Sequence, residues 1–218
     1  MSSITPDNVP QAVDLNAEEY NSVIENICDA IADKNWSVTD GIFSEDFLND
    51  LIREVSEQWE EGEFRKAGIG TGASLTVRPE IRSDRVLWLD PDDLSALQKK
   101  YTNFIDQLRQ SLNRSFYLSA KEFEGHFAVY PAGSFYKKHL DQFSGVKHRV
   151  ITCILYLNEA WKPEDGGELR IYNEDETSTH ILPQKGRFIC FRSDAVYHEV
   201  LPTTNRERFS LTGWIRTA

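Results

Sequence analysis

The second half of the chain is a succession of short strand-forming runs, and this pattern constrains the fold more than any other feature. From about Glu122 onward, segments rich in Val, Ile, Tyr, Phe and Thr alternate with turns that contain Gly, Pro, Asn or Asp. The clearest runs span residues 126–130, 149–158, 168–172, 187–191 and 208–216. Seven or eight antiparallel strands within roughly a hundred residues predict a sandwich, a jelly roll or a barrel.

The first half has the periodicity of amphipathic helices. Apolar residues recur on one helix face over 16–34, over 44–59 after an N-cap at Ser44, and over 91–112 after Asp90 and Pro91. Each helix must bury its apolar face, and the strand-rich half is the partner of sufficient size. The sequence shows no repeat and no low-complexity linker. We therefore expect one α+β domain over 1–218, with a helical N-terminal part at 1–60 and a β core at about 122–218.

Composition and charge argue against several classes of partner. The 218 residues are 40% hydrophobic and 27% charged, which is typical of a soluble globular protein, and the net charge of −11 disfavours nucleic acid. No apolar run is long enough for a membrane span, and the first residues lack the pattern of a secretion signal. Cys28, Cys153 and Cys190 lie among apolar neighbours, which favours free thiols in a reducing cytoplasm. We expect a cytoplasmic monomer that binds neither membrane nor nucleic acid.

Two side chains in the β region predict a metal site. His139 and Asp141 are two residues apart, and this spacing places both side chains on the same face of a strand. His198, well downstream, is the third candidate ligand. Two imidazoles and one carboxylate on one face of an ion form the facial triad of non-haem Fe(II) oxygenases, which leaves coordination positions open. A His-x-Asp pair alone is also common as a hydrogen-bonded surface pair, so the metal interpretation depends on the residues downstream.

The last strand places an arginine on the inward face of the predicted sheet. That face carries Arg208, Ser210, Thr212 and Trp214, and the opposite face carries Phe209, Leu211, Gly213 and Ile215. A buried guanidinium needs an anionic partner, which a dicarboxylate cosubstrate would supply. The same periodicity places Tyr156 on one face of its strand with Thr152 and Ile154, where its hydroxyl would reach the same carboxylate.

Several motifs follow one another in a fixed order along the chain. They are Tyr130-Pro131, His139-Leu140-Asp141, residues 152–158, residues 166–171, His198-Glu199-Val200, Arg208 and Trp214. Together they resemble the Fe(II)- and 2-oxoglutarate-dependent prolyl hydroxylases, and most of all the branch of the hypoxia-inducible-factor prolyl hydroxylases and their bacterial relatives. Residues 67–70 and 81–89 are also similar to that branch. The resemblance covers about residues 62–218 and leaves 1–60 without a counterpart.

This resemblance implies a fold, a reaction and a set of binding residues. The fold would be a double-stranded β-helix, or jelly roll, with packing helices from the N-terminal half. The reaction would hydroxylate a prolyl residue of a protein with dioxygen, as procollagen-proline or peptidyl-proline 4-dioxygenases do. Succinate and carbon dioxide would be coproducts, ascorbate a candidate reductant, and oxygen sensing the wider role. His139, Asp141 and His198 would hold Fe(II), and 2-oxoglutarate would contact Arg208, Tyr156, Tyr130, Thr212 and Trp214.

Arg82 and Asp84 belong, by the same resemblance, to a loop that closes over the substrate. Ser83 between them stands where that branch usually has glycine. Without the resemblance, the two charged residues would be interpreted as an exposed ion pair worth under about 1 kcal/mol. The glycine-bearing segment 62–72 before them predicts a mobile connection, and it lacks the Gly-Lys-Ser/Thr ending of a phosphate loop.

Three functions stay open on the sequence. The chain would hydroxylate a protein, or hydroxylate a free amino acid or another small molecule, or bind metal and 2-oxoglutarate as a catalytically silent sensor module. The complete triad, together with Tyr156 and Arg208, argues against the third. Arg206 is a second candidate for the cosubstrate's carboxylate, but strand parity and the distance to Trp214 favour Arg208. The remaining histidines, interpreted as ordinary strand or surface residues, are His126, His148 and His180.

Overall fold

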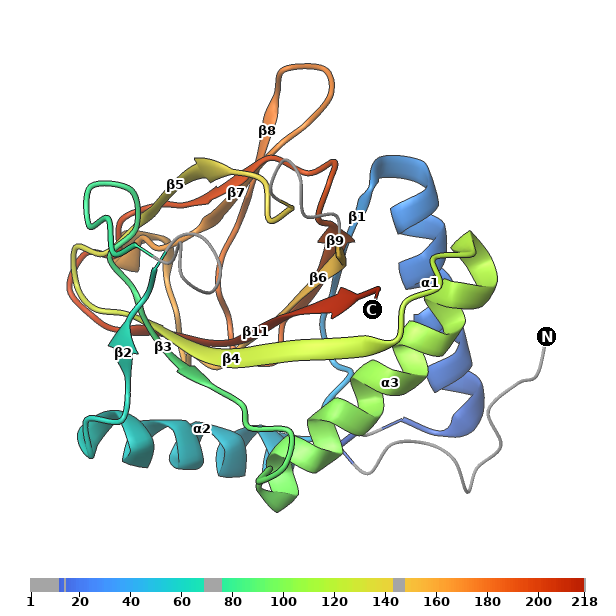
Figure 1. Ribbon diagram of the computed structural model, residues 1–218, viewed down its shortest axis with the longest axis horizontal. Helices are drawn as coiled ribbons and strands as arrows, with labels where there is room; N and C mark the ends of the chain where they lie inside the picture. Colours follow the sequence, from blue (N-terminus) through green and yellow to red (C-terminus); the bar gives the residue numbers. More distant parts are fainter. Residues whose placement is uncertain (1–11, 14, 69–75, 143–147, 218) are drawn as a thin grey trace.

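The computed structural model describes residues 12, 13, 15–68, 76–142 and 148–217 of the chain. The helices of this part are α1 (Ala17–Lys34), α2 (Glu45–Glu60) and α3 (Ala96–Phe116). They pack on the outer face of one β-sheet, and a second, smaller sheet lies across the inner face (Figure 1). The arrangement confirms the expected α+β fold.

The strands form two facing sheets. The larger sheet contains β1 (Trp36–Thr39), β2 (Arg65–Lys66), β3 (Arg85–Trp88), β4 (Glu122–Tyr130), β6 (Arg149–Tyr156), β9 (Phe188–Arg192) and β11 (Arg208–Arg216). The smaller sheet contains β5 (Tyr136–His139), β7 (Leu169–Tyr172), β8 (Ser178–Ile181) and β10 (His198–Val200). Their orders are β1-β9-β6-β11-β4-β3-β2 and β5-β10-β7-β8. From β4 onward the chain crosses repeatedly between the sheets, which is the topology of a jelly roll.

The five clearest predicted strands are confirmed, with small shifts of their ends. The three helices expected in the first half are present, but the sequence reasoning overlooked β1, β2 and β3, which come from residues 36–88 and extend the larger sheet. Each of them has only two to four residues, too few to display a period of two. Pairing with distant strands fixes them instead, as β1 pairs with β9 and β3 with β4.

Helix α3 begins later than Asp90 and Pro91 predict. Its N-cap is Ser95, whose hydroxyl accepts the backbone N–H of Gln98, while the Gln98 side chain accepts the backbone N–H of Ser95. Asp90 instead closes a turn, because its carboxylate accepts the N–H of Asp92. The reciprocal capping box satisfies two backbone groups at once and therefore defines the start of the helix.

Strand β11 lies in the middle of the larger sheet, and its two faces belong to different cores. Leu211 and Ile215 pack under the helices, in the same cluster as Phe104 of α3. Arg208 and Thr212 face the space between the two sheets. The alternation predicted for this strand is therefore confirmed, and the inward face is the one that builds the site.

The cysteines are free and buried, as the sequence predicts. The sulfur atoms of Cys153 and Cys190 lie 4.0 Å apart across β6 and β9. Within the described residues, no helix combines the length and the apolar character that a membrane span requires.

Candidate metal centre and active site

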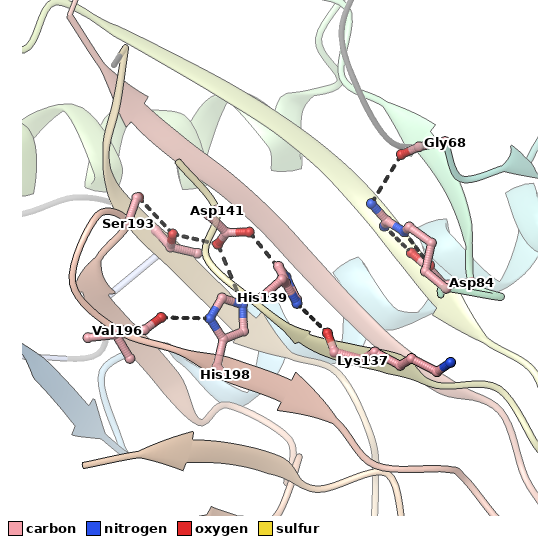
Figure 2. Close-up of polar contacts among 10 residues, drawn as sticks. Gly68, Asp84, Lys137, His139, Asp141, Ser193, Val196 and His198 are labelled. Atoms are coloured by element: carbon pink, nitrogen blue, oxygen red, sulfur yellow. Dashed lines mark hydrogen bonds and ion pairs between the residues drawn. The ribbon is translucent and has the colours of Figure 1, made fainter. Parts of the chain in front are cut away.

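His139, Asp141 and His198 meet at one end of the space between the sheets. His139 ends β5 and pairs directly with His198 on β10, and Asp141 follows two residues after β5 ends. One ligand atom from each residue lies within 4.8 Å of the other two. The Nε2 atoms of His139 and His198 lie 3.4 Å and 3.7 Å from the carboxylate oxygens of Asp141 (Figure 2). The spacing argument assumed that His139 and Asp141 share a strand; only His139 does, and a bend after it brings Asp141 inward.

Backbone carbonyls set the orientation of both imidazoles. His139 Nδ1 lies 2.7 Å from the carbonyl oxygen of Lys137, and His198 Nδ1 lies 3.1 Å from that of Val196 (Figure 2). A carbonyl only accepts, so each Nδ1 donates its hydrogen and each Nε2 keeps its lone pair. The two lone pairs converge on the side of Asp141, which is the arrangement that a metal ion needs.

Asp141 is held as a carboxylate. The Thr152 hydroxyl donates to it over 2.7 Å, and Ser193 lies 2.9 Å behind that hydroxyl. Burial alone would raise the pKa of Asp141, but the neighbouring imidazoles of His198 and His139 and the hydrogen bond from Thr152 lower it well below its usual range. Burial, reinforced by His139, lowers the pKa of His198 to about 4. An ionised carboxylate beside a neutral imidazole is the protonation state that binds metal.

At the other end of the space lies a buried arginine. Arg208 is 2% exposed, and its Nη2 donates to the hydroxyl of Tyr156 over 3.0 Å. The guanidinium lies 4.9 Å and 4.7 Å from the ring centroids of Tyr130 and Tyr156. Among the described residues its Nε has no hydrogen-bond partner, and no carboxylate forms an ion pair with it. A buried guanidinium in this state indicates a site for an anionic ligand.

One cavity connects the arginine with the three candidate ligands. Its walls also contain Tyr130, Thr212 and Trp214, which the sequence placed near the cosubstrate. Tyr156 contributes through its bond to Arg208. Arg206 lies elsewhere, because it donates to the carbonyl of Glu159 over 3.1 Å and packs on Trp161. Of the two candidate arginines, the structure brings only Arg208 into the cavity.

Sequence reasoning gave no role to several residues of the cavity wall, among them Tyr136, Ser210 and His126. His126, interpreted as an ordinary strand or surface histidine, lies on β4 and is 3% exposed, and its side chain lines the cavity wall. Its position four residues before Tyr130 on the same strand places both side chains on one face of the sheet. The alternation of side chains along the strand could therefore have identified His126 as a cavity residue.

Arg82 and Asp84 form a buried ion pair rather than an exposed one. Arg82 Nε donates to Asp84 Oδ1 over 2.8 Å, Nη2 donates to Oδ2, and the Asp84 side chain has no exposed surface. Arg82 also donates to the carbonyl of Gly68 over 3.4 Å (Figure 2). Its guanidinium lies 4.3 Å from the ring centroid of Tyr136. Arg82 lines the cavity. Of the predicted mobile segment, Gly70 and Gly72 lie outside the described residues.

Comparisons with known proteins agree with this site. The profile of the 2OG-Fe(II) oxygenase superfamily matches residues 125–216. The crystal structure of a Pseudomonas putida prolyl-4-hydroxylase is 36% identical, with a TM-score of 0.81, over 89% of this chain and 99% of that one. The chain belongs to the 2OG-Fe(II) oxygenase superfamily. A Trichoplax adhaerens prolyl hydroxylase in complex with a hypoxia inducible factor peptide shares the fold, with a TM-score of 0.83 and 22% identity over 91% of both chains.

Curated relatives place this oxygenase beside the prolyl hydroxylases that its motifs resemble. Human Egl nine homolog 1 is 27% identical over 81% of this chain, and mouse prolyl hydroxylase EGLN3 is 25% identical over 88%. The chain spans 42% of the length of the former and 82% of the latter. Together with the two structural neighbours, these relatives confirm the jelly roll and the resemblance to the branch of the hypoxia-inducible-factor prolyl hydroxylases and their bacterial relatives.

The cofactors of this oxygenase superfamily, Fe(II) and 2-oxoglutarate, fit the residues present. Two imidazoles with free Nε2 lone pairs and one carboxylate form a donor set for Fe(II). The orphaned Nε of Arg208 marks a place for a carboxylate at the opposite end of the same cavity.

Proposed function

We propose that this chain is an Fe(II)- and 2-oxoglutarate-dependent dioxygenase that hydroxylates a prolyl residue of a protein. The proposal rests on one cavity that has three metal-ligand side chains at one end and an unpaired, buried guanidinium at the other. Three protein ligands leave positions open on a metal, and an arginine across the cavity suits the far carboxylate of a chelating 2-oxo acid. A structural metal site is closed by four protein ligands and would not require an arginine across the cavity.

The residues of the cavity have two roles: some bind the metal and the cosubstrate, and others exclude water. His139, Asp141 and His198 hold the iron, while Arg208 and Tyr156 bind the distal carboxylate. When bound, iron and 2-oxoglutarate supply the oxidising chemistry, with succinate and carbon dioxide as coproducts. The chain itself orients these groups and excludes water with apolar lining residues, which include Ile154, Leu169 and Val200.

A protein substrate is the part of the proposal that depends on the relatives. The structure of the Trichoplax enzyme is a complex with a peptide of the hypoxia inducible factor, and we extend that substrate class to this chain. The buried Arg82–Asp84 pair supports the extension, because it holds a charged side chain in a fixed position on the cavity wall, where it is available to a substrate. Ascorbate dependence, oxygen sensing, a cytoplasmic location and a monomeric state stay predictions from the sequence.

The test is aerobic incubation of the purified protein with Fe(II), 2-oxoglutarate and either lysate proteins or free amino acids. We expect one-oxygen additions on prolyl residues of a protein, with an equal amount of succinate, and neither with the Asp141→Ala variant. Hydroxylation of a free amino acid alone would assign a small-molecule hydroxylase. Binding of 2-oxoglutarate with no succinate in either arm would assign the sensor module.

A further inference from the structure

His126 is a polar residue of the cavity wall to which the proposed function gives no role. It shares one face of β4 with Ala128 and Tyr130, and all three line the cavity. The Nδ1 atom of His126 is buried and has no hydrogen-bond partner among the described residues. Buried polar groups in folded proteins almost always have a partner, so this nitrogen is available to a ligand.

Two tryptophans hold the His126 ring in place. Its centroid lies 4.8 Å from that of Trp88, with 50° between the planes, and 5.3 Å from that of Trp214, with 34° between the planes. Burial, reinforced by Arg82 and Arg149, lowers the pKa of His126 to about 3. The imidazole is therefore neutral and carries one N–H donor in a fixed orientation.

Strand register places His126 between the arginine and the metal ligands. Along β11, Arg208 pairs with Tyr130, and Thr212 pairs with His126. One step further along the same face, Trp214 pairs with Thr152 of β6, whose hydroxyl donates to Asp141. A molecule that reaches from Arg208 to the metal ligands must therefore pass the level of His126 and Thr212.

We propose that His126 is a cosubstrate-binding residue that donates a hydrogen bond through Nδ1 to the carboxylate at the 2-oxo acid end of 2-oxoglutarate. This inference rests on the proposed function. Arg208 binds the carboxylate at the far end, and His126 binds the one beside the metal. A neutral N–H suits that position, because it stabilises the carboxylate without placing a positive charge next to the metal ligands.

The test is calorimetric titration of 2-oxoglutarate into the anaerobic Mn(II)-loaded protein, so that binding is measured without turnover. In His126→Phe the ring still fills the space between the tryptophans but has no donor, and we expect the affinity to fall about tenfold or more. His126→Asn places an amide near the position of Nδ1 and should restore most of the affinity. His126→Gln places its amide near Nε2 and should not. His180→Phe, on the exposed face of β8, is the matched control and should bind like the wild type.

Several results would overturn the inference. The wild type and His126→Phe would bind 2-oxoglutarate equally well, or His126→Phe and His126→Asn would lose the same affinity. Alternatively, only His126→Gln would restore the affinity, or the substitutions would change binding of the protein substrate and not of 2-oxoglutarate. Failure of the wild type itself to bind 2-oxoglutarate would count against the proposed function instead. If the variants do not fold, ¹⁵N-histidine NMR of the wild-type Zn(II) protein decides. The His126 Nδ1 signal should shift when 2-oxoglutarate is added, and an unchanged signal would refute the contact.

Discussion

The two ends of the cavity are built in opposite ways. At the metal end the polar atoms are already paired within the protein, since both histidine Nδ1 atoms bind backbone carbonyls and Asp141 accepts from Thr152. At the other end Arg208 has one hydrogen bond to Tyr156 and an unpaired Nε. The protein thus fixes the geometry of the metal ligands in advance, and it leaves the arginine to be completed by a ligand. Substitutions at the two ends should therefore fail differently.

The largest effect is expected at the metal end. His139→Ala, Asp141→Ala and His198→Ala each remove one of three ligands, and two remaining ligands hold a divalent ion too weakly to survive purification. We expect the wild type to carry one Fe(II) or Mn(II) per chain by elemental analysis and each variant to carry none. His180→Ala is the control outside the cavity. Full metal content in all three ligand variants would refute the triad.

The arginine end should show a graded loss rather than an absolute one. Arg208→Ala removes a charge-assisted contact worth about 1.5 to 3 kcal/mol, so 2-oxoglutarate affinity should fall roughly ten- to a hundredfold while metal content is kept. Arg206→Ala is the matched control, because Arg206 packs on Trp161 away from the cavity. Calorimetry with the Mn(II) protein measures both. Similar losses for the two variants would mean that the distal carboxylate lies elsewhere.

The hydrogen bonds that hold the metal ligands can be weakened without removing a ligand. Thr152→Val keeps the shape of the side chain but deletes the hydroxyl that donates to Asp141 over 2.7 Å. Loss of such a supporting contact commonly costs about ten- to a hundredfold in metal affinity, and we expect the lower part of that range because His139 and His198 keep their own contacts. Competition with a metal chelator gives the affinity. An unchanged value would show that the bend after β5 positions Asp141 by itself.

The same contrast explains which parts of the site could be predicted from the sequence. Strand period places Arg208 on the face opposite Phe209, Leu211 and Ile215, and it groups Tyr156 with Thr152 and Ile154, because a one-residue slip would send the whole apolar set to the wrong core. The burial of Arg82 and Asp84 could not be predicted, since it depends on contacts with Tyr136 and Gly68 that are remote in sequence. His126 has the same parity as Tyr130, but nothing in the sequence shows that its Nδ1 has no partner.

The Arg82–Asp84 pair lies beside the cavity and belongs to neither the metal end nor the arginine end. Its substitution is therefore expected to have the smallest effect. One backbone hydrogen bond, from the Ser83 N–H to the Phe135 carbonyl, joins the two residues before β5, and the Ser83 hydroxyl accepts the N–H of Phe135 over 3.2 Å. This junction holds Arg82 above the ring of Tyr136. The junction reaches the metal ligands through Tyr136, whose ring centroid lies 3.6 Å from that of His139, and among the described residues neither Arg82 nor Asp84 forms a hydrogen bond or ion pair with a metal ligand. Its loss should therefore affect the polypeptide substrate most.

Asp84→Ala should therefore slow hydroxylation of a polypeptide severalfold and leave the slow succinate release without substrate unchanged. Ser83→Gly removes one hydrogen bond and keeps the ion pair, so it should produce a smaller change of the same kind. Because Asp84→Ala leaves Arg82 buried without its partner, the double variant Arg82→Ala/Asp84→Ala and the melting temperature are the controls for folding. Succinate measured with and without polypeptide separates the outcomes. A parallel fall of both rates would mean that the pair supports the metal centre, and unchanged rates would remove the main structural support for a protein substrate.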